Sequence, residues 1–511
     1  MKRRAIVSSP DIASTPRQLF WRSPTIILLV ALACLLLIGL RVAAEFSLKQ
    51  PLHRQTSGCE EEALFSIWKF SQGQTVYADP SAIPFSISYF NWLFYVTYGG
   101  VVALALNFLH LDCQWVPNFT RCLTLLFSIG CCGAFYQAAR AAAAWPQEMP
   151  FVARLGLAIV VAFNPLFGFF NFTTRPDVAA VFFELAGLCL MLRYLKTNQR
   201  TAFWSAAMAL YVAWAFKQTT INVLAGCMLW FLLRKNFRDF SLLAFTTIVL
   251  YAITFAVGGE LYLFSVVQSQ ANCALRISGG LEYFLRASIK FPFLPLILGA
   301  VLGERIRMLL FRRKADFTAI ELVFIFSLLW STLTSMKEGA SEYYFLPPCV
   351  YGAIWLLQAW SVRSMRGENT AWPQRILIAG CALQFLTILP IFAGRAGVIS
   401  MHAEHVRHQK LADALQEYEA PVLVTERFGN LPWIQRKPPH FLFAYTYLVD
   451  RAAGRKYQER GLGGLIAKKY FRTIVVRTDW LGDVAAFDGQ PFNGYKRVGT
   501  VDSYALYIRM D

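Results

Sequence analysis

Long apolar runs separated by short polar segments extend from residue 23 to residue 395. A helix needs about 20 apolar residues to cross a bilayer, and most of these runs approach that length. The runs predicted to span the membrane are 23–44, 118–139, 152–172, 178–196, 201–216, 219–234, 239–258, 291–311, 317–334, 343–361 and 375–395. The pattern therefore predicts a polytopic α-helical membrane protein with about 11 transmembrane helices.

Basic residues between the runs predict which side of the membrane each connection occupies. Lys and Arg gather at 140–154, 193–200, 234–238, 305–314 and 363–375, and two predicted spans separate each cluster from the next. Because short cytoplasmic loops collect positive charge, all five clusters are expected inside. Residues 1–22 then form a cytoplasmic N-terminal tail, and residues 45–117 form a first outer loop.

Two apolar segments do not fit simple crossings. The run 88–109 is long enough to span, but a crossing there would leave the N-terminal basic cluster outside, so we interpret it as interfacial or re-entrant. The pair 201–216 and 219–234 is short for two full crossings. Lys217, in the turn between them, is therefore expected to lie deep, in a recess that water can reach.

Beyond residue 395 the sequence becomes polar and its periodicity changes. A helical stretch at 402–419 is followed by strand-like VLVTE and KYFRTIVVR and by a hairpin pattern between YKRVGTV and YALYIRM. This predicts a small α/β domain over 396–511, outside the membrane because the number of spans is odd. His402, His405 and His408 share one side of the helix, but a solvated face is favoured over a metal site.

Composition supports the membrane assignment. The chain is 56% hydrophobic and only 16% charged, and its mean hydropathy is +0.43. The net charge of +18 would suit a nucleic-acid partner, but the basic residues sit in clusters between apolar runs and not on one continuous face. No nucleic-acid partner is therefore expected, and the positive charge is assigned to membrane topology.

Three consecutive glutamates, Glu60, Glu61 and Glu62, lie shortly after the first span. Ionisable groups close to hydrocarbon are costly, and they usually face a water-filled cavity that serves a substrate. The alternative is that they begin an interfacial helix, where acidic residues suit the positive end of the dipole. Adjacent positions on a helix point in different directions, so only one or two of the three can face one cavity.

The predicted topology brings three further polar segments to the same outer face. These are NFTTRPD at 171–177, KQTT at 217–220 and SMKEGASEYYFLPP at 335–348, and they contribute Arg175, Asp177, Lys217, Lys337, Tyr343 and Tyr344. Taken singly, each has a structural explanation, because basic residues snorkel at span ends and tyrosines populate the aromatic belt. Their convergence on one face favours a functional site.

The residue types in these segments fit a single reaction. A carboxylate can act as the general base that removes a proton from an acceptor hydroxyl. Lys, Arg and tyrosine hydroxyl groups can stabilise the charge that develops on a departing phosphate. A direct displacement of this kind needs one base and no protein nucleophile, so we expect it to invert the anomeric centre.

The same segments resemble the GT-C glycosyltransferases, polytopic enzymes with lipid-phosphate sugar donors that include protein O-mannosyltransferases and the lipid A aminoarabinose transferase. The acidic cluster and the Gly-x-x-x-Tyr-x-Asp phrase of Gly73, Tyr77 and Asp79 resemble the first outer loop of that superfamily, with 85–109 as its second juxtamembrane helix. Arg-Pro-Asp at 175–177 resembles its second acidic site, and 337–348 resembles its lysine, tyrosine and Leu-Pro segment. The resemblance covers roughly residues 20–400.

The resemblance implies roles for particular residues. Glu60 or Glu61 and Asp177 would be catalytic, and Lys217, Lys337, Arg175, Tyr343 and Tyr344 would bind the donor phosphate. The usual first-loop pair is Asp-Glu, and by distance from Gly73 the aspartate position fits Glu60 or Glu61 better than Glu62.

The lysine often found before the second juxtamembrane helix is missing from residues 82–85, so Arg276, Arg286 and Lys290 are further phosphate-binding candidates. Metal dependence varies in the superfamily, and the sequence contains no dedicated metal cage. A divalent metal is compatible with the resemblance, but no metal ligand is assigned.

The sequence thus predicts a membrane glycosyltransferase, hexosyl or pentosyl, with its catalytic domain at 23–395. It would move a sugar from a polyprenyl-phosphate donor to a glycan, lipid or protein acceptor at the outer face of the cell inner (cytoplasmic) membrane. A transporter or flippase of lipid-linked sugars is the alternative, and an inactive scaffold that presents its outer domain is a third reading. Transporters usually show paired halves and broken helices at mid-membrane, and the sequence shows no duplicated pattern.

Overall fold

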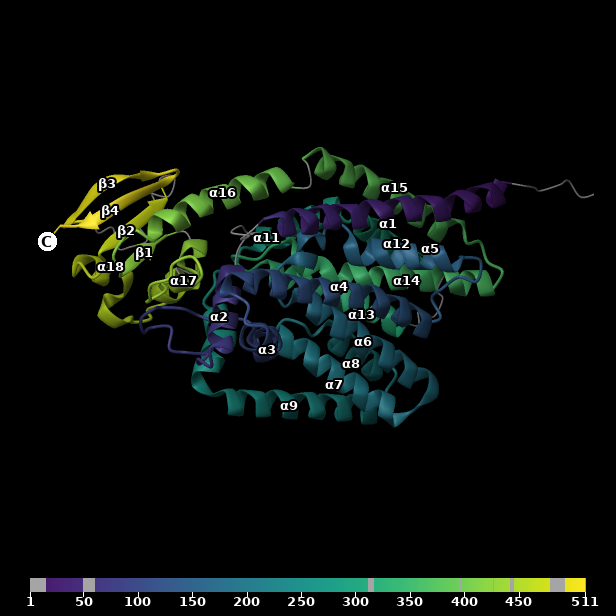
Figure 1. The fold of residues 1–511 in the computed structure, drawn as a ribbon. Helices are drawn as coiled ribbons and strands as arrows, with labels where there is room; N and C mark the ends of the chain where they lie inside the picture. The colour runs from purple at the N-terminus through teal and green to yellow at the C-terminus, as the bar shows by residue number, and fades with distance from the viewer. Residues whose placement is uncertain are drawn as a thin grey trace, which may run out of the picture.

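A bundle of long helices makes up most of the molecule, and a small C-terminal domain lies at one end of it (Figure 1). The computed structural model describes residues 15–48, 60–310, 317–394, 397–425, 427–441, 445–477 and 492–510. The helices of the bundle are α1 (Thr15–Ser47), α4 (Val116–Ala141), α5 (Phe151–Phe163), α6 (Asp177–Thr197), α7 (Arg200–Phe216), α8 (Asn222–Leu233), α9 (Phe237–Leu263), α12 (Phe293–Leu310), α13 (Ala319–Ser335), α14 (Leu346–Met365) and α15 (Ala371–Ala393).

Shorter helices connect these elements, mostly at the end of the bundle that carries the C-terminal domain. They are α2 (Glu60–Ser71), α3 (Trp92–Phe108), α10 (Ser269–Ala271) and α11 (Ile277–Lys290), with 3-10 turns η1 (Cys113–Trp115), η2 (Gly168–Phe172) and η4 (Glu342–Phe345) and a π-helical turn η3 (Phe264–Gln268). These connections supply most of the polar residues that the sequence placed on one face.

The protein is a multi-pass membrane protein, although the predicted count of 11 spans is not confirmed. In the part of the chain that the structure describes, six helical stretches are long and apolar enough to cross a membrane, or seven if a bent pair counts as one. The six are Pro24–Ser47, Cys113–Ala141, Asp177–Thr197, Phe237–Ala271, Glu342–Met365 and Ala371–Leu415. Each of the other predicted spans coincides with a shorter or bent helix.

Local sequence explains why some predicted spans are shorter or bent. The run 152–172 stops being helical at Phe163, because Asn164 precedes Pro165 and a residue before proline is held out of the helical region. The run 291–311 is one arm of a bent pair, in which α11 and α12 meet at 109°. The run 88–109 forms the 17-residue helix α3, which packs against α2 and is seen nearly end-on in Figure 1.

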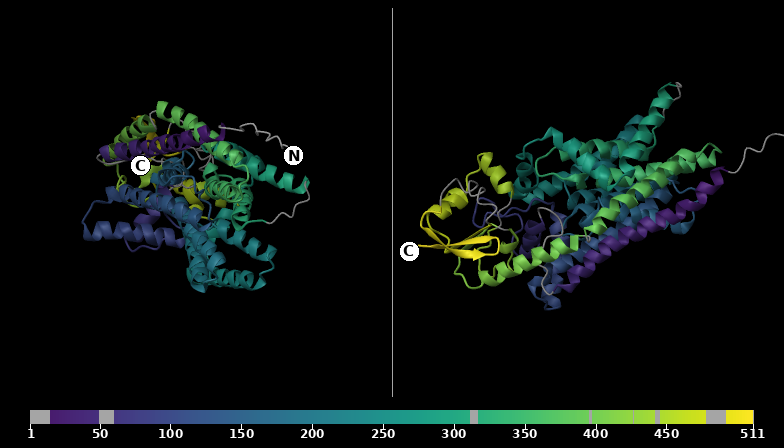
Figure 2. Two further views of the ribbon diagram at one scale, coloured as in Figure 1. Left: turned by 90° about the vertical axis from the view of Figure 1, so that its right-hand side faces the viewer. Right: turned by 90° about the horizontal axis from the view of Figure 1, so that it is seen from above.

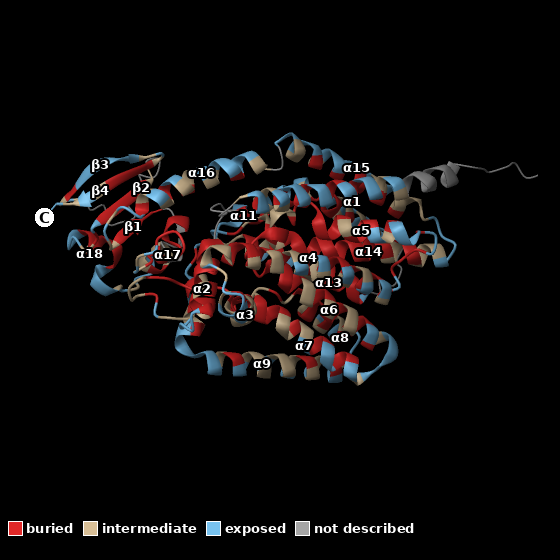
Figure 3. Cartoon of the chain, in the orientation of Figure 1, coloured by how far each residue is buried: buried red, intermediate tan, exposed pale blue. Residues whose placement is uncertain are grey.

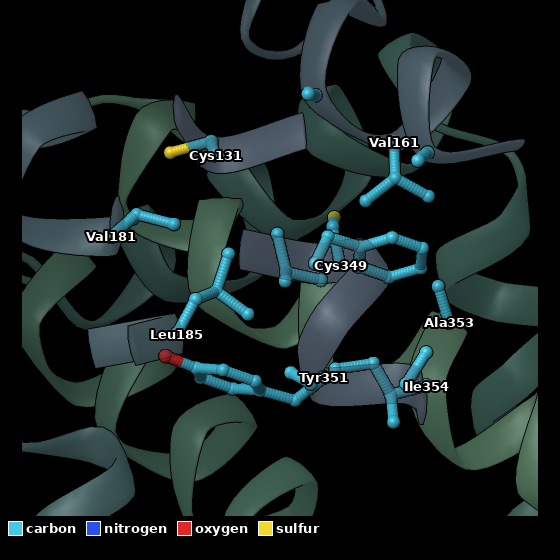
Figure 4. Packing of buried hydrophobic residues seen from close by; sticks show 14 of the residues in the cluster. Cys131, Val161, Val181, Leu185, Cys349, Tyr351, Ala353 and Ile354 are labelled. Atoms are coloured by element: carbon cyan, nitrogen blue, oxygen red, sulfur yellow. The ribbon is translucent and has the colours of Figure 1, made fainter. Parts of the chain in front are cut away.

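The core of the bundle is apolar and closely packed. Buried residues concentrate on α4, α6 and α14, whereas α9 at the edge is largely exposed (Figure 3). Figure 4 shows part of this core, where Leu185 of α6 and Ile354 of α14 lie near Tyr351.

One carboxylate is enclosed in that core. Glu184 accepts hydrogen bonds from Asn222 Nδ2, the Val223 amide and Tyr351 Oη, at 3.0, 3.1 and 2.9 Å. Since burying a carboxylate requires such compensation, this cluster joins α6, α8 and α14 and is assigned a structural role.

The C-terminal domain has the α/β composition that the sequence predicts. It contains helices α16 (Val398–Leu415), α17 (Tyr445–Ala452) and α18 (Gly461–Ala467), turns η6 (Arg427–Asn430) and η7 (Gln458–Arg460), and strands β1 (Val422–Val424), β2 (Thr473–Arg477), β3 (Tyr495–Val501) and β4 (Tyr504–Arg509). The sheet order is β1-β2-β4-β3, with β1 and β2 parallel and the other pairs antiparallel. The predicted hairpin is β3 and β4.

The histidines of α16 are not gathered into a metal site in the described part of the chain, where no cluster of three or more His, Cys, Asp or Glu residues is suited to a metal. His408 is buried, and its ring stacks on Phe428 at 5.3 Å between centroids. It therefore packs the helix against the domain.

The C-terminal domain packs against α2, which lies in the connection between α1 and α4. α16 continues the direction of α15 away from the bundle, and the views in Figure 2 show α15 running beside α1. Leu411, Leu415 and Trp433 of the domain share one hydrophobic cluster with Leu64 and Phe65 of α2. The domain, α2 and α3 are thus one packed layer at one end of the bundle.

His440 lies in this layer, and we expect it to make stability depend on pH. Its ring meets Phe65 and Trp68 edge-on at 6.2 and 5.9 Å, and burial lowers its pKa from 6.5 to about 4. Below pH 6.5 the unfolded chain binds a proton at His440 that the folded chain does not bind until about pH 4. Stability should therefore fall over this window, by up to about 3 kcal/mol from this group.

Thermal unfolding of the wild type and of His440→Phe between pH 7 and pH 4 tests this expectation. Phenylalanine keeps a ring of similar shape and cannot be protonated, so the variant should gain stability relative to the wild type as the pH falls. Parallel melting curves across this range would show that His440 is not a source of acid sensitivity.

Candidate functional site

A cavity of about 430 Å³ lies where several of the connecting segments meet. Its polar wall comes from segments far apart in the sequence: Glu62 of α2, Arg175 before α6, Lys217 and Gln218 between α7 and α8, Gln270 of α10, Lys337 and Glu338 after α13, and Tyr343 and Tyr344 of η4. All four polar segments predicted to converge therefore contribute to one cavity.

Asp177 holds two of the cavity cations. It begins α6, and its Oδ2 accepts from Arg175 Nε at 3.0 Å while its Oδ1 accepts from Lys217 Nζ at 2.5 Å. The carboxylate and the guanidinium are almost completely buried, and Lys217 is 12% exposed. Asp177 thus places two positive groups side by side at the cavity wall.

Two tyrosines form the other face of this cation pair. The rings of Tyr343 and Tyr344 stack at 4.7 Å. The Arg175 guanidinium lies 4.4 Å from the Tyr343 ring centre, and Lys217 Nζ lies 4.6 Å from both ring centres. Cation–π contacts of this kind fix the positions of the cations without neutralising their charge.

The third cation that lines the cavity, Lys337, follows α13. Its Nζ donates to Gln270 Oε1, and its backbone forms an isolated antiparallel bridge with Leu275. Arg276 and Glu338 add hydrogen bonds between the same two segments, from Arg276 N to Met336 O at 2.6 Å and from Glu338 N to Ala274 O at 2.8 Å. The wall that carries Lys337 is therefore a short paired structure.

The three glutamates of α2 have different surroundings. All are buried, but Glu62 is the one that lines the cavity. Glu60 Oε1 accepts from Arg121 Nε at 2.9 Å and from the Thr174 amide at 3.1 Å. The helical spacing predicted that the three would diverge, and the geometry favours Glu62 over Glu60 and Glu61 as the group that can reach a substrate.

Arg121 was not singled out from the sequence, although it anchors this region. It is fully buried on α4 between Glu60 and Glu45, with its Nη1 2.6 Å from Glu45 Oε1. An arginine inside a predicted span is itself a signal, because such residues are rare unless they are paired. Through Glu60 and the Thr174 amide, Arg121 supports the backbone next to Arg175.

The Gly-x-x-x-Tyr-x-Asp phrase shapes the connection between α1 and α4. Gly73 has φ of +69°, a conformation that favours glycine. Tyr77 Oη donates to Phe90 O at 2.8 Å, and burial raises the pKa of its phenol well above the usual value. Asp79 accepts from the Ser81 amide and from Arg455 of the C-terminal domain, at 2.9 and 3.1 Å. These residues close the loop and do not line the cavity.

The additional phosphate-binding candidates lie away from the cavity. Arg276 and Arg286 both pair with Glu282 on α11, and Lys290 pairs with Glu342. Lys290 and Glu342 line a separate, mostly apolar cavity of about 340 Å³ beside α1. Cation candidates at the main site are thereby narrowed to Arg175, Lys217 and Lys337.

Solved structures of an oligosaccharyltransferase from the archaeon Archaeoglobus fulgidus share this architecture. AglB in complex with an inhibitory peptide and a dolichol-phosphate matches 97% of this chain and 75% of its own, at 10% identity and a TM-score of 0.51. The complex with Zn and sulfate matches 95% and 73% at 12% identity with a TM-score of 0.51, and the apo form 91% and 71% at 11% identity with a TM-score of 0.56.

The chain has the GT-C fold. This confirms the architecture implied by the sequence resemblance. No protein-family model and no curated protein sequence matches the chain, so the relationship is visible in the fold alone.

One structure with this GT-C fold contains Zn, so we asked whether the described residues suit a divalent metal. Within the described ranges no three His, Cys, Asp or Glu side chains come together as metal ligands. Asp177, the carboxylate at the head of α6, already has one oxygen on Arg175 and the other on Lys217. A metal needs such oxygens for itself and is repelled by two adjacent cations. This donor set does not fit a divalent metal.

Proposed function

We propose that this protein is an integral-membrane glycosyltransferase that moves a sugar from a polyprenyl-phosphate donor to an acceptor at the outer face of the cytoplasmic membrane. The observation that carries the proposal is the meeting of Glu62 with Arg175, Lys217 and Lys337 in one cavity of a GT-C fold. The dolichol-phosphate and peptide bound by AglB support a lipid-phosphate donor and a protein acceptor, although a glycan or lipid acceptor fits the cavity chemistry equally well.

In the proposed reaction, an acceptor hydroxyl oxygen attacks C1 of the sugar. Glu62 takes the hydroxyl proton as the new C1–O bond forms, which is general base catalysis. The bond between C1 and the phosphate oxygen breaks, and its electron pair leaves with the polyprenyl phosphate. Attack from the side opposite the leaving group inverts C1. The carboxylate therefore carries the proton, and no covalent protein intermediate is needed.

The leaving phosphate needs positive charge near the departing oxygen. Arg175 and Lys217 are held together by Asp177 and the tyrosine pair, and Lys337 lines the same cavity. Preorganised cations stabilise developing negative charge more than mobile ones, because they need not reorganise during the reaction. We assign donor-phosphate binding to these cations with Tyr343 and Tyr344, and we assign Asp177 the role of aligning two of them.

Binding of undecaprenyl phosphate to Lys217→Gln tests the phosphate assignment. Loss of one charged contact should raise the dissociation constant by about 10–100-fold. Binding by purified protein in nanodiscs can be measured by competition with a fluorescent polyprenyl phosphate. Lys410→Gln, an exposed lysine of α16, is the matched control.

The same assay with excess EDTA should give the wild-type dissociation constant, because protein cations supply the charge at this site. Lys217→Gln that binds like the wild type would argue against the assigned site. Loss of binding on chelation would show that the wild type requires a metal.

The orientation of the protein can be tested separately. The C-terminal domain lies at the same end of the bundle as α2 (Figure 1), and Glu62 of α2 lines the cavity. The basic loops predict that this end is outside. Alkaline phosphatase fused after residue 511 should be active, and a green fluorescent protein fusion at the same position should be dark. The reverse pattern would place the cavity in the cytoplasm, where the proposed outer-face reaction could not occur.

A further inference from the structure

The segment from Ser269 to Arg276 lies between the C-terminal domain and the cavity. On one side, Gln270, Ala271 and Cys273 line the cavity. On the other, Ser269 Oγ donates to Asp450 Oδ2, and Asn272 Nδ2 donates to Asp450 Oδ1, both at 3.0 Å. Ser269 and Asn272 of this short segment therefore contact the domain, whereas Gln270, Ala271 and Cys273 line the cavity.

Asp450 is well placed to fix this segment. It lies on α17 and is 1% exposed, and each of its two carboxylate oxygens accepts one of these hydrogen bonds. Hydrogen bonds to a charged group are stronger than neutral ones, and leaving a partner unsatisfied is costly. The buried Asp450 carboxylate binds both Ser269 of α10 and the following Asn272. It therefore fixes the position of α10.

The same segment sets the position of Lys337. Gln270 accepts from Lys337 Nζ, and the backbone of residues 274–276 is hydrogen-bonded to residues 336 and 338. A displacement of α10 would thus move both the side-chain partner and the backbone partner of this cation. The contacts run without a break from Asp450 to Lys337.

A second contact joins the same part of the domain to the first outer loop. Gln458 makes two hydrogen bonds to the loop. Its backbone N–H donates to Ser81 O at 2.9 Å, and its side-chain Oε1 accepts from the Ile83 backbone N–H at 3.2 Å. Arg455 Nε also donates to Ser81 Oγ at 2.6 Å. Residues 445–458 therefore contact two separate outer connections of the bundle.

We propose that Asp450 is a positioning residue, through which the C-terminal domain sets the wall that carries Lys337. The proposal rests on the proposed function for its consequence in donor binding, but the mechanical link from Asp450 to residues 269–276 is independent of the substrate. The domain then acts on the chemistry of the cavity without contributing a side chain to it.

The mechanical link is tested by the reactivity of Cys273, which is buried in the same segment with its Sγ 3.9 Å from Ser269 O. Full-length protein in nanodiscs is treated with a polar maleimide, and modification of Cys273 is followed by peptide mass spectrometry. Asp450→Ala should raise the labelling rate by about tenfold, because the segment opens more often. Asp413→Ala, an exposed aspartate of α16 in the same domain, should not change it.

The functional consequence is tested by a double-mutant cycle on undecaprenyl phosphate binding. Asp450→Ala and Lys337→Ala should each raise the dissociation constant, and the double variant should be no weaker than Lys337→Ala alone. Asp450→Asn, which keeps the shape and can still accept one hydrogen bond, should give a smaller effect in both assays. If Asp450→Ala does not fold, Asp450→Asn and Asn272→Ala are used in its place. The first weakens the contact from the domain side, and the second removes the Asn272 donor from the segment side.

The outcomes separate the two proposals. Cys273 labelling that stays within about twofold of the wild type in every Asp450 variant overturns the positioning role. Additive effects in the cycle overturn the route through Lys337. A wild type that binds no undecaprenyl phosphate overturns the proposed function, while the labelling result still decides whether Asp450 holds the segment.

Discussion

Glu62→Gln is expected to abolish sugar transfer while leaving binding of undecaprenyl phosphate close to the wild-type value. Glu62 lines the cavity, whereas the phosphate assignment rests on the cations around it. Glutamine keeps the size of the side chain but cannot accept a proton at neutral pH. A positioned general base contributes about 10²–10⁴-fold to the rate, so the transfer rate of the variant should be lower than that of the wild type by this factor.

The measurement is transfer of a radiolabelled sugar from cell membranes, or mass spectrometry of cell-envelope glycans in a deletion strain that carries each variant. Glu417→Gln, an exposed glutamate of the C-terminal domain, is the control. Full activity of Glu62→Gln, with activity lost in a folded Glu60→Gln or Glu61→Gln, would reinstate the base favoured by the sequence. Loss of phosphate binding in Glu62→Gln would indicate a role in donor binding.

Arg121→Met is expected to destabilise the protein by about 3–5 kcal/mol, because it leaves Glu45 and Glu60 buried without their shared cation. The effect should appear as a large fall in the thermal unfolding midpoint in detergent. Arg366→Met, at a 68% exposed arginine, should change little.

The triple variant Arg121→Met, Glu45→Gln, Glu60→Gln provides a stringent comparison. It removes the charges of Arg121, Glu45 and Glu60 together and leaves only the neighbouring Arg41, which also interacts with both glutamates. Replacing a buried ion pair or triad by uncharged side chains is often close to neutral. We expect it to recover most of the lost stability. A triple variant as unstable as Arg121→Met would mean that the shape of the arginine side chain, and not its charge, is what the region requires.

The sequence predicted the helical architecture and the meeting of four polar segments, because both depend on signals along the chain. Apolar runs predict helices, and basic loops predict which helix ends lie together. Lys217 lies in the turn between the two short helices α7 and α8 and lines the cavity.

Other features depend on contacts that one sequence does not reveal. Composition gave no sign that α11 and α12 bend by 109°, or that Arg276 and Arg286 would both pair with Glu282. The motif comparison favoured Glu60 or Glu61 as the base. Which glutamate lines the cavity depends instead on how α2 is rotated about its axis, and this rotation places Glu62 there. Asp450 could not be connected with Lys337, because the link passes through a segment about 180 residues earlier.

The spacing of Glu60 and Glu62, two positions apart on α2, has a consequence for how this region can change over time. A single inserted or deleted residue at the start of α2 would turn the following helix by about 100°. The carboxylate against Arg121 and the carboxylate at the cavity would then both lose their places in one event. The run of three glutamates offsets that risk only in part, because a shift of one position puts Glu61 in one of the two places and Ala63 or Cys59 in the other. The repeat therefore protects one of the two places against slippage at a time, but not both.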